Sequence, residues 1–292
     1  MSSTTDPDRG GVGPGQQELG VGQAVLLGAL HGPAELLPIS SSGHVTVIPW
    51  LLGWEGYEQL DPELRKAFEV ALHAGTAAAL LITLRPEVEE AVRGMSPRTA
   101  MLIALSFAPP AVVGLTLERR IERHLGTPGT IAIGLVCGSV AMAVADRAPQ
   151  IRSSREAGAR DALWLGAAQA CALIPGVSRN GATLAAARLR RFTREDANRL
   201  SRHVALPVIA GATVLKGVRL RARGLPAGTA VPFTAGAVAS FVSTLGSTWL
   251  IRQVERDRSL LPYAAYRLAL AALVTRRLRD GGRSARCTTM AP

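Results

Sequence analysis

The chain has 292 residues, of which 48% are hydrophobic and only 4% aromatic, and its formal net charge at pH 7 is +11. So few aromatic residues leave no stacking platforms for single-stranded nucleic acid, and we expect no nucleic-acid partner; the arginines are expected to face anionic lipid headgroups instead. The three cysteines have neither disulfide nor metal-site spacing, which excludes a fold held together by either.

The two ends of the chain differ from its middle. Residues 1–16 are rich in Ser, Thr, Gly, Pro and Asp and lack the apolar core of a signal peptide, so they are predicted to be a disordered tail. Residues 17–276 are predicted to form a single membrane domain, and residues 277–292 a basic C-terminal tail.

Uncharged apolar runs recur through the middle of the chain and alternate with short arginine-bearing segments. They cover residues 70–84, 99–117, 125–145, 162–178, 203–215 and 225–251. Several approach the ~20 residues that a helix needs to cross a bilayer. The pattern predicts an all-α integral membrane protein, a polytopic helical bundle. The alternative is a buried helical core in a soluble protein, since the shorter runs are alanine-rich.

Residues 27–45, LGALHGPAELLPISSSGHV, are apolar apart from a glutamate, three serines and two histidines. Pro33 and Pro38 bracket Glu35, and Ser-Ser-Ser-Gly follows, so one smooth helix is not expected. We predict a broken or re-entrant helix with Glu35 near the break and the serine amides opening a second short helix. The unpaired N–H groups and the positive dipole at such a helix start suit a phosphate group.

The pattern restarts after a charged linker at residues 146–160. A Leu-Gly-Ala segment, a hydrophobic-Pro pair and a Ser-x-x-Gly segment return in the same order. Twelve positions separate His31 from Gly43, and twelve separate Gln169 from Gly181. The order and the spacing together predict an internal duplication.

We place repeat one at about residues 17–145 and repeat two at about residues 161–276, each with one broken helix. If each half crosses the membrane an odd number of times, the repeats are inverted and their breaks meet near the midplane. Chance similarity between alanine-rich segments is the alternative.

The second interrupted segment places Arg179 in an apolar stretch. A charged side chain at the centre of a membrane helix costs ~2.5–3.5 kcal/mol on insertion scales, so Arg179 is expected to have an anionic partner. A ligand phosphate is one candidate, because the planar guanidinium matches phosphate oxygens. Glu35 is the other, and a purely structural Glu35–Arg179 bridge is the alternative to a ligand site.

These two segments resemble the signature motifs of the undecaprenyl-diphosphate phosphatase family, the integral-membrane bacitracin-resistance type. The first family motif has an acid or Gln, a Glu four positions later, and then a Leu-Pro-hydrophobic-Ser-Ser-Ser/Thr-Gly-His run. Here it reads His31-Gly-Pro-Ala-Glu35 and Leu37-Pro-Ile-Ser-Ser-Ser-Gly-His44. The second, Pro-Gly-x-Ser-Arg-Ser-Gly-Ala-Thr, reads Pro175-Gly-Val-Ser-Arg-Asn-Gly-Ala-Thr183. The likeness runs in order over about residues 20–275.

The resemblance implies an enzyme of the bacterial plasma membrane, with several crossings, that hydrolyses undecaprenyl diphosphate to undecaprenyl phosphate and inorganic phosphate. Such an enzyme recycles the lipid carrier of peptidoglycan synthesis and confers bacitracin resistance. The implied partners are the bilayer and the polyprenyl diphosphate substrate. A polyprenyl-phosphate transporter or flippase, or a catalytically impaired lipid-binding paralogue, is the rival interpretation, because inverted repeats with broken helices also describe transporters.

Carried over residue by residue, the resemblance implies two sets of site residues. The candidate catalytic residues are Glu35, Ser41 as phosphate contact or nucleophile, His44 as proton donor or acceptor, and Arg179 as the clamp for developing charge. The candidate phosphate-binding residues are Ser40, Ser42, Ser178, Asn180 and Thr183. For Ser40 and Ser42, helix capping is the alternative.

The resemblance also implies a divalent cation, Mg²⁺ or Ca²⁺, held by Glu35. His31 stands where the family has Glu or Gln, and imidazole is a poorer ligand for such hard ions, so His31 is a weaker second candidate for that ion. Asn180 stands where the family usually has Ser. For His31 and His73 a structural role is the alternative, since a lone histidine in a helical bundle is often a satisfied core group.

Overall fold

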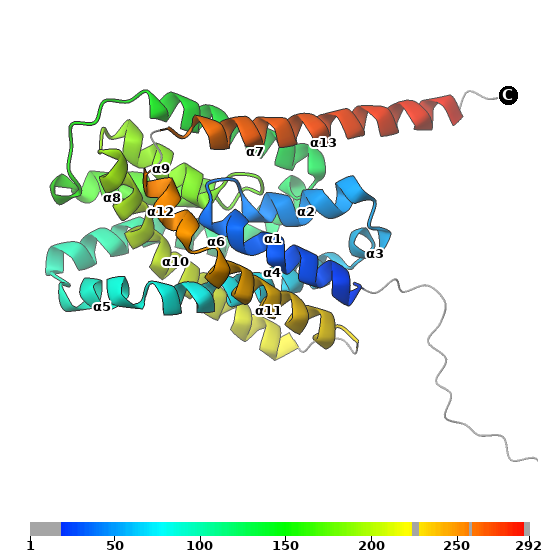
Figure 1. Cartoon of the computed structure of the whole chain (residues 1–292), viewed down its shortest axis with the longest axis horizontal. Coiled ribbons are helices and arrows are strands. Elements are labelled where there is room, and N and C mark those ends of the chain that lie inside the picture. The colour runs from blue at the N-terminus through cyan, green and yellow to red at the C-terminus, as the bar shows by residue number, and fades with distance from the viewer. Residues whose placement is uncertain (1–18, 224–227, 257–258, 289–292) are drawn as a thin grey trace, which may run out of the picture.

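The computed structural model describes residues 19–223, 228–256 and 259–288, and within these ranges the protein is a bundle of helices without strands (Figure 1). The predicted tail at residues 1–16 lies outside them. In chain order the helices are α1 (Val21–Leu36), α2 (Ser41–Leu52), α3 (Glu55–Glu58), α4 (Pro62–Thr83), α5 (Arg85–Arg93), α6 (Pro97–Leu125), α7 (Pro128–Asp146), the 3₁₀ turn η1 (Ser154–Glu156), α8 (Ala159–Cys171), α9 (Arg179–Leu189), α10 (Arg194–Arg223), α11 (Ala230–Gly246), α12 (Trp249–Arg256) and α13 (Leu261–Thr288).

Two of the described helices are long and apolar enough to cross a membrane: the Pro97–Leu117 part of α6, and α7. The pair α11 and α12, bent by 51° at its break, makes a third candidate span. Only 11% of the apolar stretch of α6 is buried inside the protein. Most of the hydrophobic surface of this helix therefore faces outward, as a lipid-facing helix requires. The protein is therefore an all-α membrane protein, as its composition predicts.

Three helices begin where the sequence supplies both a cap and a proline. Asp61, Ser96 and Thr127 accept backbone N–H groups at the starts of α4, α6 and α7, and a proline follows each of them directly. Proline at the first helical position gives up an N–H group that would be unpaired there, and its fixed φ is already helical. These local signals fix where the helices start.

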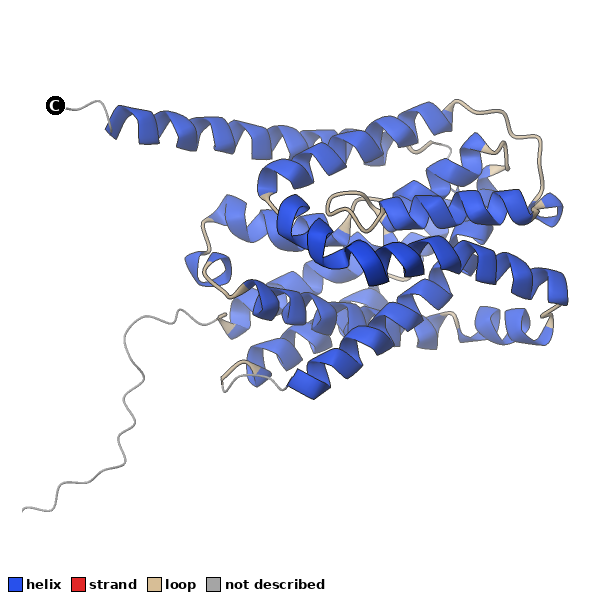
Figure 2. Ribbon diagram, turned by 180° about the vertical axis from the view of Figure 1, so that it is seen from behind, coloured by secondary structure: helices blue, strands red, loops and turns tan. Residues whose placement is uncertain are grey.

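The two predicted helix breaks are confirmed. The first helix ends at Leu36 and the next begins at Ser41, with Pro38 in the turn between them. The second break lies between α8 and α9, where Gly176 has φ +90°, a conformation that disfavours other residues. Loops join most of the remaining helices over only a few residues (Figure 2).

The packing of the two halves is reciprocal, as a duplicated chain predicts. Helix α1 packs on α11, and the equivalent helix α8 packs on α6, while α7 and α13 lie side by side (Figure 1). A Cβ atom at Gly28 would lie 2.3 Å from the carbonyl oxygen of Gly236, and one at Gly166 would lie 2.8 Å from that of Ser106. These glycines occupy the same position of the repeated Leu-Gly-Ala segment. Inversion of the two repeats across the membrane stays a prediction.

Other boundaries differ from the predicted ones. Pro33, which the sequence suggested as one side of the break, lies inside α1, so the break begins only after Glu35. Residues 277–288, placed in the basic tail, continue α13 as a helix that projects beyond the bundle (Figure 1). Within the linker, the backbone of Arg152 pairs with the segment around Phe192.

Candidate active site

The two helix breaks meet, and their charged residues form an ion pair. Glu35, in the last turn of α1, accepts a hydrogen bond from Arg179, the first residue of α9, with 2.8 Å between Oε1 and Nη2. Their side chains keep only 12% and 20% of their exposure, so the pair is largely desolvated. The predicted meeting of the carboxylate and the guanidinium is confirmed.

Ser41 extends this pair to a chain of three. It is the first residue of α2, and its Oγ donates to Glu35 Oε2 over 2.5 Å. A hydroxyl held against a carboxylate that a guanidinium orients is the arrangement of an activated nucleophile. The buried Ser41 side chain also lies at the N-terminus of a helix, where anionic groups are favoured.

Two of the predicted phosphate-binding serines are helix caps. Ser40 Oγ accepts the N–H of Gly43 at the start of α2, and Ser178 Oγ accepts the N–H of Gly181 at the start of α9. Ser40 also has φ +78°, a strained conformation for a residue with a Cβ atom. Ser42, in the first turn of α2, is partly buried. For Ser40 the capping role is confirmed, and phosphate contacts by these serines stay a prediction.

Asn180 and Thr183 hold α9 in place. Asn180 Nδ2 donates to the carbonyl oxygen of Leu36 over 3.0 Å, which ties α9 to the end of α1. Thr183 Oγ1 lies 2.6 Å from Ser201 Oγ and 2.9 Å from the carbonyl oxygen of Arg179. Their contact with phosphate stays a prediction.

His44 is completely buried in α2, and both of its ring nitrogens have partners. Nδ1 lies 2.7 Å from the carbonyl oxygen of Ser40, so this nitrogen donates. Nε2 lies 2.8 Å from the hydroxyl of Tyr266 and therefore accepts from it in the neutral ring. A proton transfer through Nε2 must displace or use the Tyr266 hydroxyl.

Arg267 holds the two breaks against each other. This side chain of α13 is fully buried and donates to the carbonyl oxygens of Pro38 in the first break and Gly176 in the second, over 3.2 and 3.0 Å. It also reaches the carbonyl oxygens of Gly134 and Leu135 in α7. The guanidinium thus satisfies backbone groups that the helix breaks leave unpaired.

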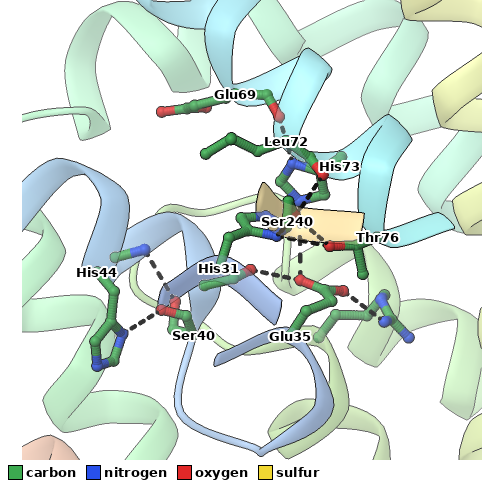
Figure 3. Close-up of polar contacts among 12 residues, drawn as sticks. His31, Glu35, Ser40, His44, Glu69, Leu72, His73, Thr76 and Ser240 are labelled. Carbon is green, nitrogen blue, oxygen red and sulfur yellow. Dashed lines mark hydrogen bonds and ion pairs between the residues drawn. The ribbon is translucent and has the colours of Figure 1, made fainter. Parts of the chain in front are cut away.

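Two histidines lie beside Glu35, near the carboxylate oxygen that Arg179 does not bind. His31 of α1 and His73 of α4 stack edge to face with ring centroids 4.5 Å apart, and His73 Nε2 lies 3.8 Å from Glu35 Oε2 (Figure 3). One potential ligand atom from each of the three residues lies within 4.8 Å of the others. This set contains one carboxylate and two imidazoles, whereas Mg²⁺ and Ca²⁺ prefer oxygen ligands. The residues present therefore fit those two ions poorly.

The family model for the bacitracin resistance protein BacA matches residues 24–273. The chain belongs to this family. A relative from Geobacter sulfurreducens, described as undecaprenyl-diphosphatase, is 40% identical over an alignment of 265 residues, and the match covers 86% of this chain and 96% of the relative. A relative of the same description from Pelobacter propionicus is 37% identical, and the match covers 86% of this chain and 94% of the relative. One from Thermomicrobium roseum is 35% identical, and the match covers 88% of this chain and 97% of the relative.

Two residues of this BacA-family site, Tyr266 and Arg267, are not among those that the two motifs predict. Arg267 has a signal in the sequence: it is the one charged residue in the stretch 261–275, and a charge inside an apolar helix is a functional candidate by default. Tyr266 has no such signal, because its importance depends on the fold bringing α13 to His44.

Proposed function

We propose that this protein hydrolyses undecaprenyl diphosphate to undecaprenyl phosphate and inorganic phosphate. Relatives that this chain matches over nearly their whole length carry the description undecaprenyl-diphosphatase. The observation in the structure that carries the proposal is the hydrogen-bonded chain Ser41–Glu35–Arg179, which places a nucleophile, a base and a cation where two helices start.

The three residues divide the chemistry of phosphoryl transfer among them. Arg179 binds the non-bridging oxygens of the terminal phosphate and stabilises the charge that develops on them. Glu35 accepts the proton of the attacking hydroxyl, from Ser41 or from a water that Ser41 positions, while the new P–O bond forms and the bond from phosphorus to the bridging oxygen breaks to release the lipid monophosphate. If Ser41 attacks, water then cleaves the phosphoserine to give inorganic phosphate. Because Arg179 and the N–H groups of α2 and α9 supply positive potential, a diphosphate is favoured over a neutral headgroup.

The membrane setting follows from the substrate. A polyprenyl diphosphate keeps its chain in the bilayer, so its headgroup reaches an enzyme whose site opens within or beside the lipid layer. We therefore place the protein in the bacterial plasma membrane as a multi-pass protein, where it regenerates the lipid carrier of peptidoglycan synthesis and so confers bacitracin resistance. The apolar outward faces of α6 and α7 support this placement.

Transport of the lipid phosphate is the rival function, and the descriptions of the relatives do not favour it. A transporter would bind the headgroup at the same paired helix breaks but would leave the anhydride bond intact. Release of inorganic phosphate distinguishes the two.

The test measures phosphate released from a polyprenyl diphosphate by the full-length protein purified in detergent. Ser41→Ala and Glu35→Gln are each expected to lower the rate by about 10²–10⁴-fold, as for loss of a nucleophile or a general base. Ser259→Ala is the matched control, since Ser259 lies at the start of α13 and bonds Asp146 instead of the site. The proposal is contradicted if wild-type protein releases no phosphate, or if Ser41→Ala and Glu35→Gln release phosphate at the rate of wild type.

A further inference from the structure

We propose that His31, Glu35 and His73 form a binding site for a divalent transition metal of the zinc class. We call these three residues the His–Glu–His cluster. Two imidazoles and one carboxylate are a donor set that Zn²⁺ and its neighbours in the first transition row accept, with an open position for water or substrate. The inference deepens the proposed function, because Glu35 belongs to both sites, but binding is measurable without turnover.

The strongest observation is an unsatisfied nitrogen. His31 is fully buried, and its Nε2 has no hydrogen-bond partner among the described residues. A buried polar atom without a partner costs about 1–3 kcal/mol, so such atoms are rare unless a bound ligand or ion completes them. His31 lies beside an imidazole and a carboxylate, which makes a cation the natural complement.

The partners of His31 Nδ1 decide which nitrogen carries the proton. Nδ1 lies 2.9 Å from Thr76 Oγ1, Thr76 Oγ1 lies 2.8 Å from Ser240 Oγ, and Ser240 Oγ donates to the carbonyl oxygen of Leu72 (Figure 3). If Nδ1–H donates to Thr76, every proton in this series of hydrogen bonds has an acceptor, and only the lone pair of His31 Nε2 has no partner. In the other tautomer a buried N–H group would be orphaned. The network therefore presents Nε2 as a ligand.

His73 is oriented in the same way. Its Nδ1 lies 2.8 Å from the carbonyl oxygen of Glu69, which only accepts, so Nδ1 carries the proton and Nε2 presents a lone pair toward Glu35. A metal-bound histidine typically donates its second nitrogen to a carbonyl or carboxylate, and this contact fixes the ring. Both imidazoles thus have the supporting hydrogen bond that a metal site needs.

Glu35 has an oxygen on the correct side. Arg179 bonds Oε1, whereas Oε2 accepts from Ser41 and faces His73. Zn–N and Zn–O distances of about 2.0–2.2 Å place tetrahedral ligands a little over 3 Å apart, so small side-chain rotations close a separation of at most 4.8 Å. His31 replaces the Glu or Gln of the family motif, and this substitution converts an oxygen-rich set into one that prefers imidazole-binding metals.

The experiment measures metal content without a polyhistidine tag. Full-length protein in detergent is stripped with EDTA, dialysed against Zn²⁺, or against Mg²⁺ or Ca²⁺ in parallel, and analysed by mass spectrometry of the metal. We expect about one zinc per chain and no retained Mg²⁺ or Ca²⁺. Co²⁺ serves as a second probe, because its visible absorption reports coordination by the ligands directly.

Variants assign the metal to the cluster. His31→Gln and His73→Gln are each expected to weaken zinc binding by at least about tenfold. His124→Gln, at an exposed position of α6, is the matched control and should bind like wild type. His31→Glu, which restores a residue of the family motif, should shift the preference from Zn²⁺ toward Mg²⁺ or Ca²⁺, and it keeps the test decisive if a glutamine variant does not fold.

The proposal is overturned if stripped wild type takes up no zinc, if both glutamine variants bind it as tightly as wild type, or if Mg²⁺ at equal concentration displaces it. Phosphate release by protein that binds no zinc would refute the metal site alone. Stoichiometric zinc without phosphate release would refute the proposed hydrolysis alone.

Discussion

Arg267 is a buried charge that donates to backbone carbonyl oxygens and to the sulfur of Met142, while its Nε has no hydrogen-bond partner among the described residues. Burying a guanidinium is costly unless its donors are paired, and here Nη1 and Nη2 reach the carbonyl oxygens of both helix breaks and of α7. Space for it is made by Gly138, where a Cβ atom would lie 2.1 Å from Nη2. One side chain thus bonds to both breaks, in addition to the Glu35–Arg179 and Asn180–Leu36 contacts that join them.

Replacing this guanidinium should damage both stability and activity. Arg267→Met is expected to lower the free energy of unfolding by about 3–5 kcal/mol, because the carbonyl oxygens lose their donor in a buried setting. Thermal unfolding in detergent and phosphate release measure the two effects. Arg276→Met, at an exposed position of the same helix, is the control and should change neither.

A substitution of Arg179 tests the role of its ion pair with Glu35. Arg179→Lys keeps the positive charge beside Glu35 but loses the planar fork that matches phosphate oxygens. We expect phosphate release to fall by about 10²–10³-fold with little change in thermal stability. Arg199→Lys, in an exposed ion pair of α10, is the control. A lysine variant with the rate of wild type would mean that Arg179 only bridges the two breaks.

At the scale of helices, the close approach of α1 to α11 and of α8 to α6 depends on one glycine each. Gly28→Ala and Gly166→Ala would place a Cβ atom 2.3 and 2.8 Å from a backbone carbonyl oxygen, so both should lower the unfolding temperature strongly. Gly22→Ala, on α1 with open space around it, should be neutral or raise stability by up to about 1 kcal/mol. Equal effects of all three substitutions would contradict the reciprocal packing.

The start of α8 predicts a pH dependence. Asp161 precedes the apolar run of that helix. Burial alone would raise the pKa of its carboxyl, but hydrogen bonds from Arg152, the N–H of Gly158 and Arg190 outweigh burial and lower this pKa from 3.8 to about 2. The ionised form is therefore favoured in the folded state, so this contribution to stability is complete above about pH 4 and is lost as the pH falls toward 2.

Thermal unfolding between pH 7 and pH 2.5 tests this contribution. Asp161→Asn should be less stable than wild type at pH 7, and the difference between the two should shrink as the pH falls. A difference that stays constant across this range would mean that the ionised carboxylate adds nothing beyond its neutral hydrogen bonds.

Much of this arrangement could be predicted from the sequence. Pro38 and the Ser-x-x-Gly segments indicated both breaks, because proline removes a backbone N–H and serine caps a new helix start. Pro33 marked no break, since it lies inside α1. The pairing of Glu35 with Arg179 followed from the cost of a charge in lipid. The partners of His31 did not follow, since Thr76 and Ser240 come from α4 and α11 and carry no motif that sets them apart. Such contacts depend on packing between distant segments.

At the scale of the whole molecule, the two halves are interlocked. Each broken helix packs on a helix of the other half, and the candidate site takes Glu35 and Ser41 from one half and Arg179 from the other. Neither half contains a complete site or covers its own apolar surface.

Cutting the chain in the linker tests this interlocking. Fragments 1–149 and 150–292, expressed together, should purify as one complex and release phosphate, whereas either fragment alone should do neither. Co-purification and the phosphate assay measure the outcome. Turnover by a single fragment would show that one half suffices for the chemistry.

The contact between Arg267 and the carbonyl oxygen of Pro38 joins residues 229 positions apart. During synthesis, the turn at Pro38 enters the membrane before Arg267, whose guanidinium donates to this turn, has been translated. The candidate site can be completed only when α13 is inserted, so we expect the nascent protein to have no activity on lipid carriers before its synthesis ends. A premature stop codon anywhere ahead of Arg267 should for the same reason abolish activity, even where both sequence motifs have been translated.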